Sequence, residues 1–128
     1  MLKRDFIMVQ IEELAKVVLQ IITNRNTGAT RKIPDMVQSV YTSLKLDRET
    51  LLSSSPEDLI ARLNQDDEGG IQRLEIAIKT LIEESYLYPD QQKEILLKAK
   101  ELLLYIQMHD NTFSLERVAL LQDIENKI

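Results

Sequence analysis

One stretch of the chain carries oxygen-bearing side chains at the spacing of a calcium-binding loop. The stretch is residues 64–75. Its positions 1, 3, 5, 6 and 12 are Asn64, Asp66, Glu68, Gly69 and Glu75. A loop of the EF-hand kind needs oxygen ligands at offsets 1, 3 and 5, a glycine for its sharp turn and a bidentate Glu at its end. A single calcium loop is therefore one hypothesis for this stretch.

The same stretch also fits an acidic turn between two helices. Asn64 stands where such loops usually have Asp, which removes one charge, and the sequence offers no second loop to pair with this one. Gly69 and Gly70 can end one helix, and the carboxylates around them favour the N-terminus of the next helix. Both interpretations stay open, and the departures from the calcium pattern favour the turn.

The other reactive residue types do not form a catalytic pattern. The chain has no Cys and one His, which excludes thiol nucleophiles, disulfides and His-rich metal cages. His109 and Asp110 are neighbours at a predicted helix end, where a His interacts favourably with the helix dipole. Residues 53–55 are three serines without a basic partner at a recognisable spacing. We therefore predict a protein that is not an enzyme and uses no cofactor.

The composition is that of one globular domain over residues 1–128. Hydrophobic residues make up 44% and charged residues 29% of the chain, which suits a single apolar core. The net charge is −5, and residues 65–128 carry 13 acidic against seven basic side chains. This acidic half disfavours nucleic acid as a partner, and the one basic concentration, Arg25, Arg31 and Lys32, is typical of a solvated loop. Since no uncharged apolar run reaches about 18 residues, we expect no membrane span and a cytoplasmic protein.

Apolar residues recur every three to four positions through most of the chain, which predicts an all-α fold of five to six antiparallel helices. The expected helices cover residues 3–24, a segment from 34, a segment from 56, 71–87, 91–108 and a segment from 115. Ser55 and Ser114 stand at N-cap positions, and Leu115, Val118, Leu121 and Ile124 form the expected apolar face of the last helix. The short links favour a bundle or stacked helical hairpins of the tetratricopeptide type.

Two of the expected helices carry more apolar residues than one buried face requires. The helix over 3–24 has a wide apolar stripe, so it is either the central helix or part of a self-association surface, which makes a homodimer one expectation. In the helix over 91–108, three apolar residues lie nearly opposite the main apolar face, and two tyrosines precede that helix. These candidate partner-binding residues are Tyr86, Tyr88, Leu97, Leu104 and Met108. Unless neighbouring helices cover them as core, they indicate a protein–protein interaction or scaffolding module of unknown partner.

Two parts of the sequence resemble an uncharacterised family of small bacterial helical proteins. The first part is MLKRDFIM at 1–8 with IEELA at 11–15. The second part comprises Leu59, Ile60, Leu63, Gly69, Gly70, Ile71, Glu75, Ala77 and Leu81. Ile76 separates Glu75 from Ala77, whereas the family has the Glu and Ala side by side. The resemblance implies an all-helical, tetratricopeptide-like fold and implies no activity, because the family has no assigned function.

Overall fold

The periodic apolar pattern folds into helices in the computed structural model, which describes residues 3–64 and 67–128 and, within them, the side chains from residue 6 onward. In these residues there are seven α-helices, one short 3-10 helix and no strand. The elements are α1 (Lys3–Thr27), α2 (Ile33–Leu44), α3 (Arg48–Ser53), α4 (Pro56–Asn64), α5 (Gly70–Ser85), η1 (Pro89–Gln91), α6 (Gln92–His109) and α7 (Leu115–Lys127). The predicted all-α class is confirmed, and the expected count of five to six helices is too low.

The additional helix is α3, which follows the polar residues after α2. Asp47 caps it, because its Oδ1 accepts a hydrogen bond of 2.7 Å from the Thr50 N–H, and this bond lowers the pKa of Asp47. Leu51 is fully buried and fixes the short helix to the core. The predicted N-caps of two later helices are confirmed, since Ser55 and Ser114 accept backbone N–H groups at 3.1 and 3.2 Å.

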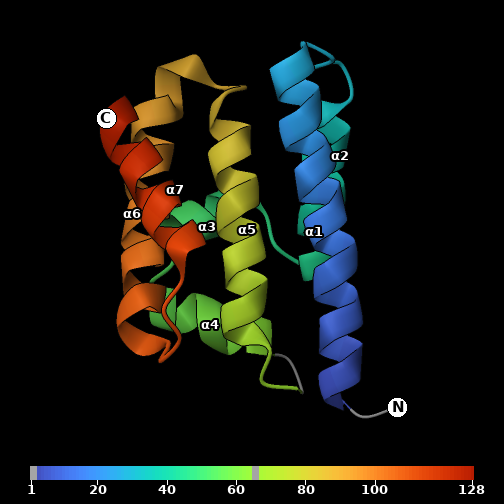
Figure 1. Cartoon of the computed structure of the whole chain (residues 1–128), viewed down its shortest axis with the longest axis vertical. Helices are drawn as coiled ribbons and strands as arrows, with labels where there is room; N and C mark the ends of the chain where they lie inside the picture. The colour runs from blue at the N-terminus through green and yellow to red at the C-terminus, as the bar shows by residue number, and fades with distance from the viewer. Residues whose placement is uncertain (1–2, 65–66) are drawn as a thin grey trace.

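The helix α5 lies in the middle of the bundle and packs against α1, α2, α4 and α6. Figure 1 shows the five long helices running alternately up and down, with α1 and α2 on one side of α5 and α6 and α7 on the other. The shorter α3 and α4 lie across this direction, so the antiparallel arrangement describes the long helices and not the whole chain. Of the two alternatives for the helix at the N-terminus, the central position is not observed, because α5 is central and α1 lies to one side of it.

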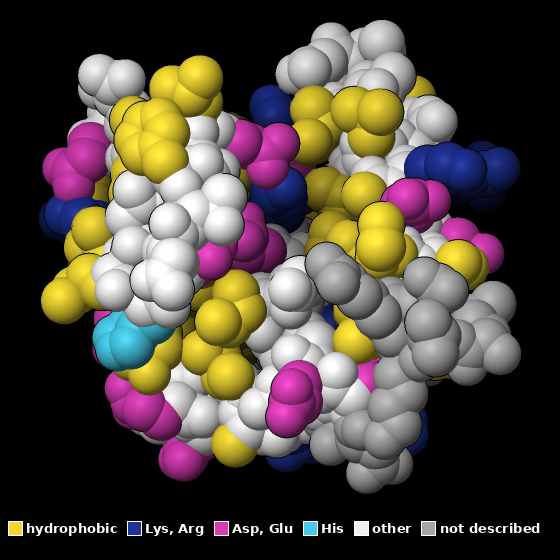
Figure 2. Space-filling view, turned by 60° about the horizontal axis from the view of Figure 1, so that its bottom comes forward, with side chains coloured by type: hydrophobic (Ala, Val, Ile, Leu, Met, Phe, Trp, Pro, Cys, Tyr) yellow, Lys and Arg dark blue, Asp and Glu magenta, His cyan; other side chains and the backbone are white. Residues whose placement is uncertain are grey.

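One apolar core joins the helices. Leu14, Val18 and Ile21, which belong to the expected seam of α1, are buried against α2 and α5. Phe6 and Leu19 of the same helix are 59% and 63% exposed. Figure 2, which views the molecule more nearly from one end, shows hydrophobic side chains reaching the surface in separate patches among charged ones. Part of the apolar stripe on α1 is therefore exposed. Self-association through this helix remains a prediction.

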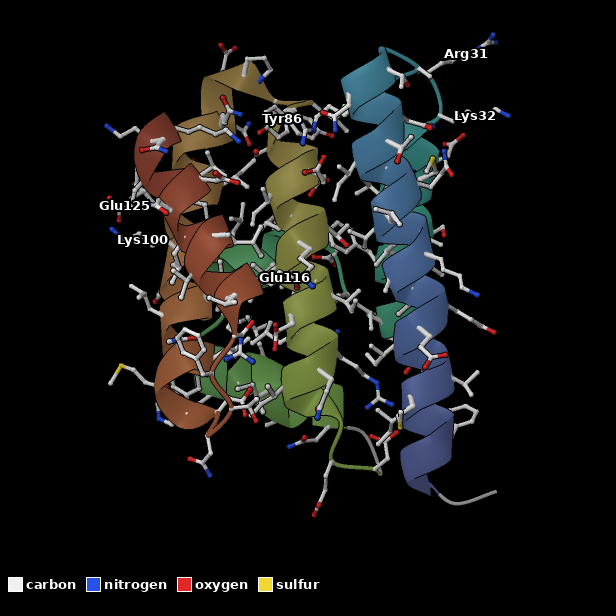
Figure 3. All side chains as sticks on the ribbon, in the orientation of Figure 1. Arg31, Lys32, Tyr86, Lys100, Glu116 and Glu125 are labelled. Atoms are coloured by element: carbon white, nitrogen blue, oxygen red, sulfur yellow. The ribbon has the colours of Figure 1, made fainter. Side chains whose placement is uncertain are left out.

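The predicted apolar face of the last helix is confirmed in its second half only. Ile124 is buried and Leu121 packs partly buried against the core, but Leu115 is 75% and Val118 is 40% exposed. Ion pairs along α7 tie it to its neighbours, with Lys79 of α5 paired to Glu116 and Lys100 of α6 paired to Glu125. Figure 3 labels Lys100, Glu116 and Glu125 where these helices lie side by side.

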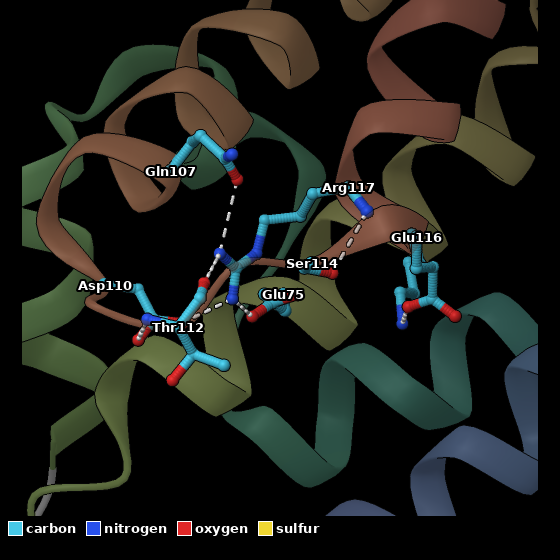
Figure 4. A network of polar contacts seen from close by, with 8 residues as sticks. Glu75, Gln107, Asp110, Thr112, Ser114, Glu116 and Arg117 are labelled. Carbon is cyan, nitrogen blue, oxygen red and sulfur yellow. Dashed lines mark hydrogen bonds and ion pairs between the residues drawn. The ribbon is translucent and has the colours of Figure 1, made fainter.

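At the start of α7 the buried position is taken by Arg117, whose side chain is only 5% exposed. Figure 4 shows its guanidinium among Glu75, Asp110 and Thr112. Its Nη2 donates to Glu75 Oε1 of α5 at 2.8 Å and to Asp110, and its Nη1 donates to the Thr112 carbonyl at 3.3 Å. Asp110 and Thr112 belong to the link between α6 and α7. The hydrogen bond from Arg117 lowers the pKa of Asp110 and keeps this carboxyl ionised. One guanidinium therefore joins α5, α7 and the link before α7.

Candidate functional site

The two ends of the predicted calcium loop make contacts within the protein. Asn64 Oδ1 accepts the Gly70 N–H at 3.0 Å, and Glu75 Oε1 accepts a hydrogen bond from Arg117 at 2.8 Å. Asp66 lies outside the described residues. Among the residues that the structure describes, no group of three or more His, Cys, Asp or Glu is placed to hold a metal ion. The calcium loop stays a prediction, while the observed contacts are those of a turn that starts α5.

A buried arginine holds this turn together. Arg73 is fully buried, binds the Asp67 carboxylate with two hydrogen bonds, and donates to the Leu63 carbonyl at 2.9 Å and to Gln10 of α1 at 2.8 Å. Glu68 is exposed and adopts a φ of 64°. At least one acidic residue of the turn therefore serves as the partner of a buried cation. The calcium-loop spacing of the sequence did not predict this role.

A groove between α6 and the start of α4 contains three of the five candidate partner-binding residues. Leu97, Leu104 and Met108 are 46%, 43% and 81% exposed, and they line a groove of about 670 Å³ together with Pro56 and Tyr105. The opposite face of α6 is buried in the core. The predicted second apolar face of this helix is therefore present and accessible in the chain itself.

The rim of this groove is acidic. Glu57 forms no ion pair with another described residue, and Glu101 is about half exposed although Lys98 pairs with it at 2.9 Å. Lys100 also lies on the rim, but its ammonium group pairs with Glu125 of α7. The groove thus combines an apolar floor with carboxylates that remain accessible to a partner.

Tyr86 and Tyr88 do not line this groove. Arg25 lies over the Tyr86 ring at 4.2 Å and Lys127 at 4.8 Å, whereas Arg48 lies over the Tyr88 ring at 3.9 Å. These are cation–π distances, so both rings are held by charged neighbours within the protein. The structure therefore does not bring the five predicted residues into one surface.

Tyr88 instead lines a polar pocket between α2, α3 and the end of α5, which the sequence did not predict. The buried Tyr41 hydroxyl donates to Glu84 Oε1 at 2.8 Å, and the Glu84 side chain is 9% exposed. Burial raises the pKa of Glu84, and burial followed by the nearby Glu84 charge raises the pKa of Tyr41. Arg48 Nη1 lies 3.6 Å from Glu84 Oε2. Tyr41, Glu84 and Arg48 therefore form a connected group of ionisable side chains at this pocket.

The sequence feature that could have indicated this pocket is the adjacent acidic pair Glu83 and Glu84 near the end of a buried helix. Because neighbours on a helix point in different directions, the two side chains have different partners. Glu83 binds Arg25 of α1 at 2.6 Å, and Glu84 faces α2 and α3. Arg25 therefore does not belong to the solvated loop, unlike the exposed Arg31 and Lys32, which Figure 3 shows pointing away from the bundle. Two acidic side chains at the end of an apolar helix indicate that basic side chains from other helices pair with them.

His109 and Asp110 contact different groups and do not act as a pair. His109 Nδ1 lies 2.8 Å from the Tyr105 carbonyl oxygen, and its ring stacks on Tyr105 with centroids 3.9 Å apart. Asp110 binds Arg117. The arrangement does not orient the imidazole by the carboxylate, as an acid–base pair would require.

Comparison of the chain with protein-family models, curated proteins and solved structures finds no match. The resemblance to small bacterial helical proteins therefore rests on the residues quoted above. Among the helices described, none has the length and apolar character needed to cross a membrane. Function is accordingly inferred from the groove.

Proposed function

We propose that this protein is a helical interaction module that binds an amphipathic helix of a partner protein in the groove between α6 and the start of α4. The observation that carries this proposal is the exposed stripe of Leu97, Leu104 and Met108 on a helix whose other face is fully buried. Contiguous apolar surface on a folded chain marks contact sites for other molecules. An apolar groove beside a helix is the usual receptor for an amphipathic helix.

The length of the apolar stripe on α6 indicates the length of the partner helix. Leu97 and Met108 are 11 residues apart, and a rise of about 1.5 Å per residue gives a stripe of roughly 16 Å. A partner helix covers this length with about three turns, so it must present apolar side chains at positions i, i+4 and i+7. Tyr105 and Pro56 also line the groove and add apolar contact.

The charge at the rim of the groove indicates which charged residues the partner helix carries beside its apolar stripe. Glu57 of α4 and Glu101 of α6 line the groove together with its apolar residues, and the chain carries a net charge of −5. Lys or Arg beside the apolar stripe of the partner would therefore meet accessible carboxylates, whereas acidic flanks would be repelled. We commit to a partner helix with basic flanks, and a second copy of this chain is the competing occupant.

A designed peptide tests this function directly. The probe is a labelled 14-residue amphipathic helix with Leu at i, i+4 and i+7 and Lys on both flanks, and a second probe carries Glu in place of each Lys. Fluorescence anisotropy should show binding of the Lys peptide and at least about tenfold weaker binding of the Glu peptide. Leu104→Glu should weaken binding by roughly 30-fold, the effect of losing an interface hot spot.

The matched control is Leu115→Glu, because Leu115 is 75% exposed on α7 and does not line the groove. Equal binding by the two variants would refute the groove as the site. Sedimentation of the unliganded protein tests the competing occupant. A dimer that dissociates in Leu104→Glu would assign the groove to self-association instead.

The finer expectations from the sequence belong to the same proposal. Consecutive packing of α4 on α5, α5 on α6 and α6 on α7 supports helical hairpins stacked in the tetratricopeptide manner. The bacterial origin, the cytoplasmic location and the lack of enzymatic activity stay predictions from the sequence.

A further inference from the structure

One carboxylate interrupts the exposed apolar row of α6. Leu97, Glu101, Leu104 and Met108 follow one another at spacings of four, three and four residues, which places them along one face of a helix. All four line the groove between α6 and the start of α4. A partner helix that packs along this row must therefore place one of its side chains against Glu101.

Glu101 keeps part of its hydrogen-bonding capacity for that partner. Its side chain is 53% exposed, and Lys98 Nζ lies 2.9 Å from one of its oxygens, Oε2. The same ammonium group donates to the Ser54 carbonyl at 2.8 Å, which holds Lys98 on one side of the carboxylate. If only apolar side chains covered Glu101, its other oxygen would lose water without gaining a donor, which is unfavourable. A donor on the partner helix at this point would offset that loss.

Tyr105 offers an aromatic face next to Glu101. It follows Glu101 by four residues, lines the same groove and is half-buried. His109, another four residues along, stacks on one face of the Tyr105 ring with centroids 3.9 Å apart and 15° between the ring planes. Because residues four apart are about one helical turn apart, His109 covers the ring face directed towards the end of α6, and the other face is directed towards Glu101. A cation bound to Glu101 can therefore also lie over the Tyr105 ring.

A guanidinium group suits these two features better than an ammonium group does. Its planar fork can donate two parallel hydrogen bonds to a carboxylate, and its flat face stacks on aromatic rings, whereas a lysine ammonium is a compact and strongly hydrated charge. The charges around the groove also favour a cation. Lys100 is paired with Glu125, while Glu57 on the α4 side forms no ion pair with another described residue.

We propose that the partner helix carries an arginine within its apolar face, bound to Glu101 and stacked on Tyr105, a proposal that rests on the function proposed for the groove. One ion pair inside an otherwise apolar contact also fixes the register of the two helices. A shift of the partner by one turn would set its arginine against Leu97 or Leu104 and leave Glu101 covered by apolar side chains. Glu101 is thus the residue that determines specificity, and the apolar residues around it supply contact area.

Three peptides test this choice with the full chain. Each is the labelled 14-residue helix with Leu at i, i+4 and i+7 and Lys on both flanks. Position i+3, which lies beside the Leu at i+4 on the apolar face, is Arg, Lys or Leu. Fluorescence anisotropy should show that the Arg peptide binds at least about fivefold more tightly than either of the others, because only Arg both pairs with Glu101 and stacks on Tyr105.

Variants of the protein assign the preference to these two residues. Glu101→Gln should weaken binding of the Arg peptide by about tenfold, through loss of the charged hydrogen bonds, and should not weaken binding of the Leu peptide. Tyr105→Leu should reduce the preference for Arg over Lys to less than about twofold, because the ring face is lost. The matched control is Glu13→Gln, which removes an exposed carboxylate from α1 outside the groove and should bind the Arg peptide like the original protein.

The outcomes distinguish this proposal from the function proposed for the groove. If Leu104→Glu weakens binding of all three peptides but the Lys or Leu peptide binds as tightly as the Arg peptide, the groove is a helix-binding site and the arginine is wrong. Equal effects of Glu101→Gln and Glu13→Gln on the Arg peptide would also overturn the arginine. If no peptide binds, or if Leu104→Glu has no effect, both proposals fail.

Discussion

Replacing Arg117 with methionine separates the two ways in which α7 is held, by the buried guanidinium and by apolar packing. Methionine keeps much of the length and the apolar stem, but it removes the charge, so Glu75 and Asp110 lose their cation. Their side chains are 20% and 26% exposed. Water can therefore recover part of their hydration, but not all of it.

These exposures set the expected size of the effect. Removing one partner of a fully buried ion pair costs about 3–5 kcal/mol, whereas an exposed pair contributes about 0–1 kcal/mol. Arg117 is almost fully buried and its acidic partners are mostly buried, so we expect a loss of about 2–3 kcal/mol, between these limits. For a chain of 128 residues this corresponds to a fall in melting temperature of roughly 6–15 °C.

Far-UV circular dichroism of both variants during heating and in urea measures this loss. The matched control is Lys100→Met, because Lys100 and Glu125 also join α6 to α7 but are 32% and 51% exposed. That change should cost less than about 1 kcal/mol. Equal losses in the two variants, or a loss below about 1 kcal/mol in Arg117→Met, would refute the view that the buried guanidinium holds α7.

Three further changes test local features of the fold. Gly70→Ala should destabilise the protein by about 1–3 kcal/mol, because an added Cβ would lie 2.5 Å from the Ile60 carbonyl oxygen; an unchanged urea midpoint would contradict this contact. Asp47→Ala should cost about 1 kcal/mol through loss of the cap on the Thr50 N–H, whereas Asp47→Asn should retain most of the stability. Burial raises the pKa of Glu84 in the folded protein, so its contribution to stability falls as the pH rises from about 4.3, the unfolded value, through the raised pKa. Urea unfolding from pH 4 to 7 should therefore show a stability difference between the original protein and Glu84→Gln that declines with pH, and a constant or rising difference would exclude this sign.

Local patterns predicted most of the fold because helices depend on residues close in sequence. Apolar spacing located the long helices, and Ser55 and Ser114 marked two N-termini through hydroxyl groups that act within three residues. The short helix α3 was missed because it has too few residues for a periodic pattern, and its stability depends on burial of Leu51. The face of α7 was predicted wrongly at Leu115 and Val118, because Arg117 is buried there by its hydrogen bond to Glu75, a residue far away in the sequence.

In the candidate sites, too, the features set by nearby residues were predicted and those set by distant residues were not. Periodicity placed Leu97, Leu104 and Met108 on a second face of one helix, but it could not decide whether neighbouring helices cover that face, and the fold shows that they leave it exposed. The places of Tyr86 and Tyr88 depended on Arg25 and Arg48, which belong to α1 and α3, far from the tyrosines in the sequence. A list of residue types cannot supply such pairings, because an ion pair between distant segments leaves no spacing signal.

The central position of α5 also determines how the protein comes apart. Of the helices described, α5 makes the main contacts both with α1 and α2 and with α4 and α6, while α7 packs chiefly on α6. The two sides of the molecule therefore pack on one shared helix, and if either side loses this packing, the apolar surface of α5 that it covered is exposed. Amide protons of α5 should exchange with solvent deuterium only through global unfolding, while those of α7 exchange through a smaller opening that leaves the rest intact.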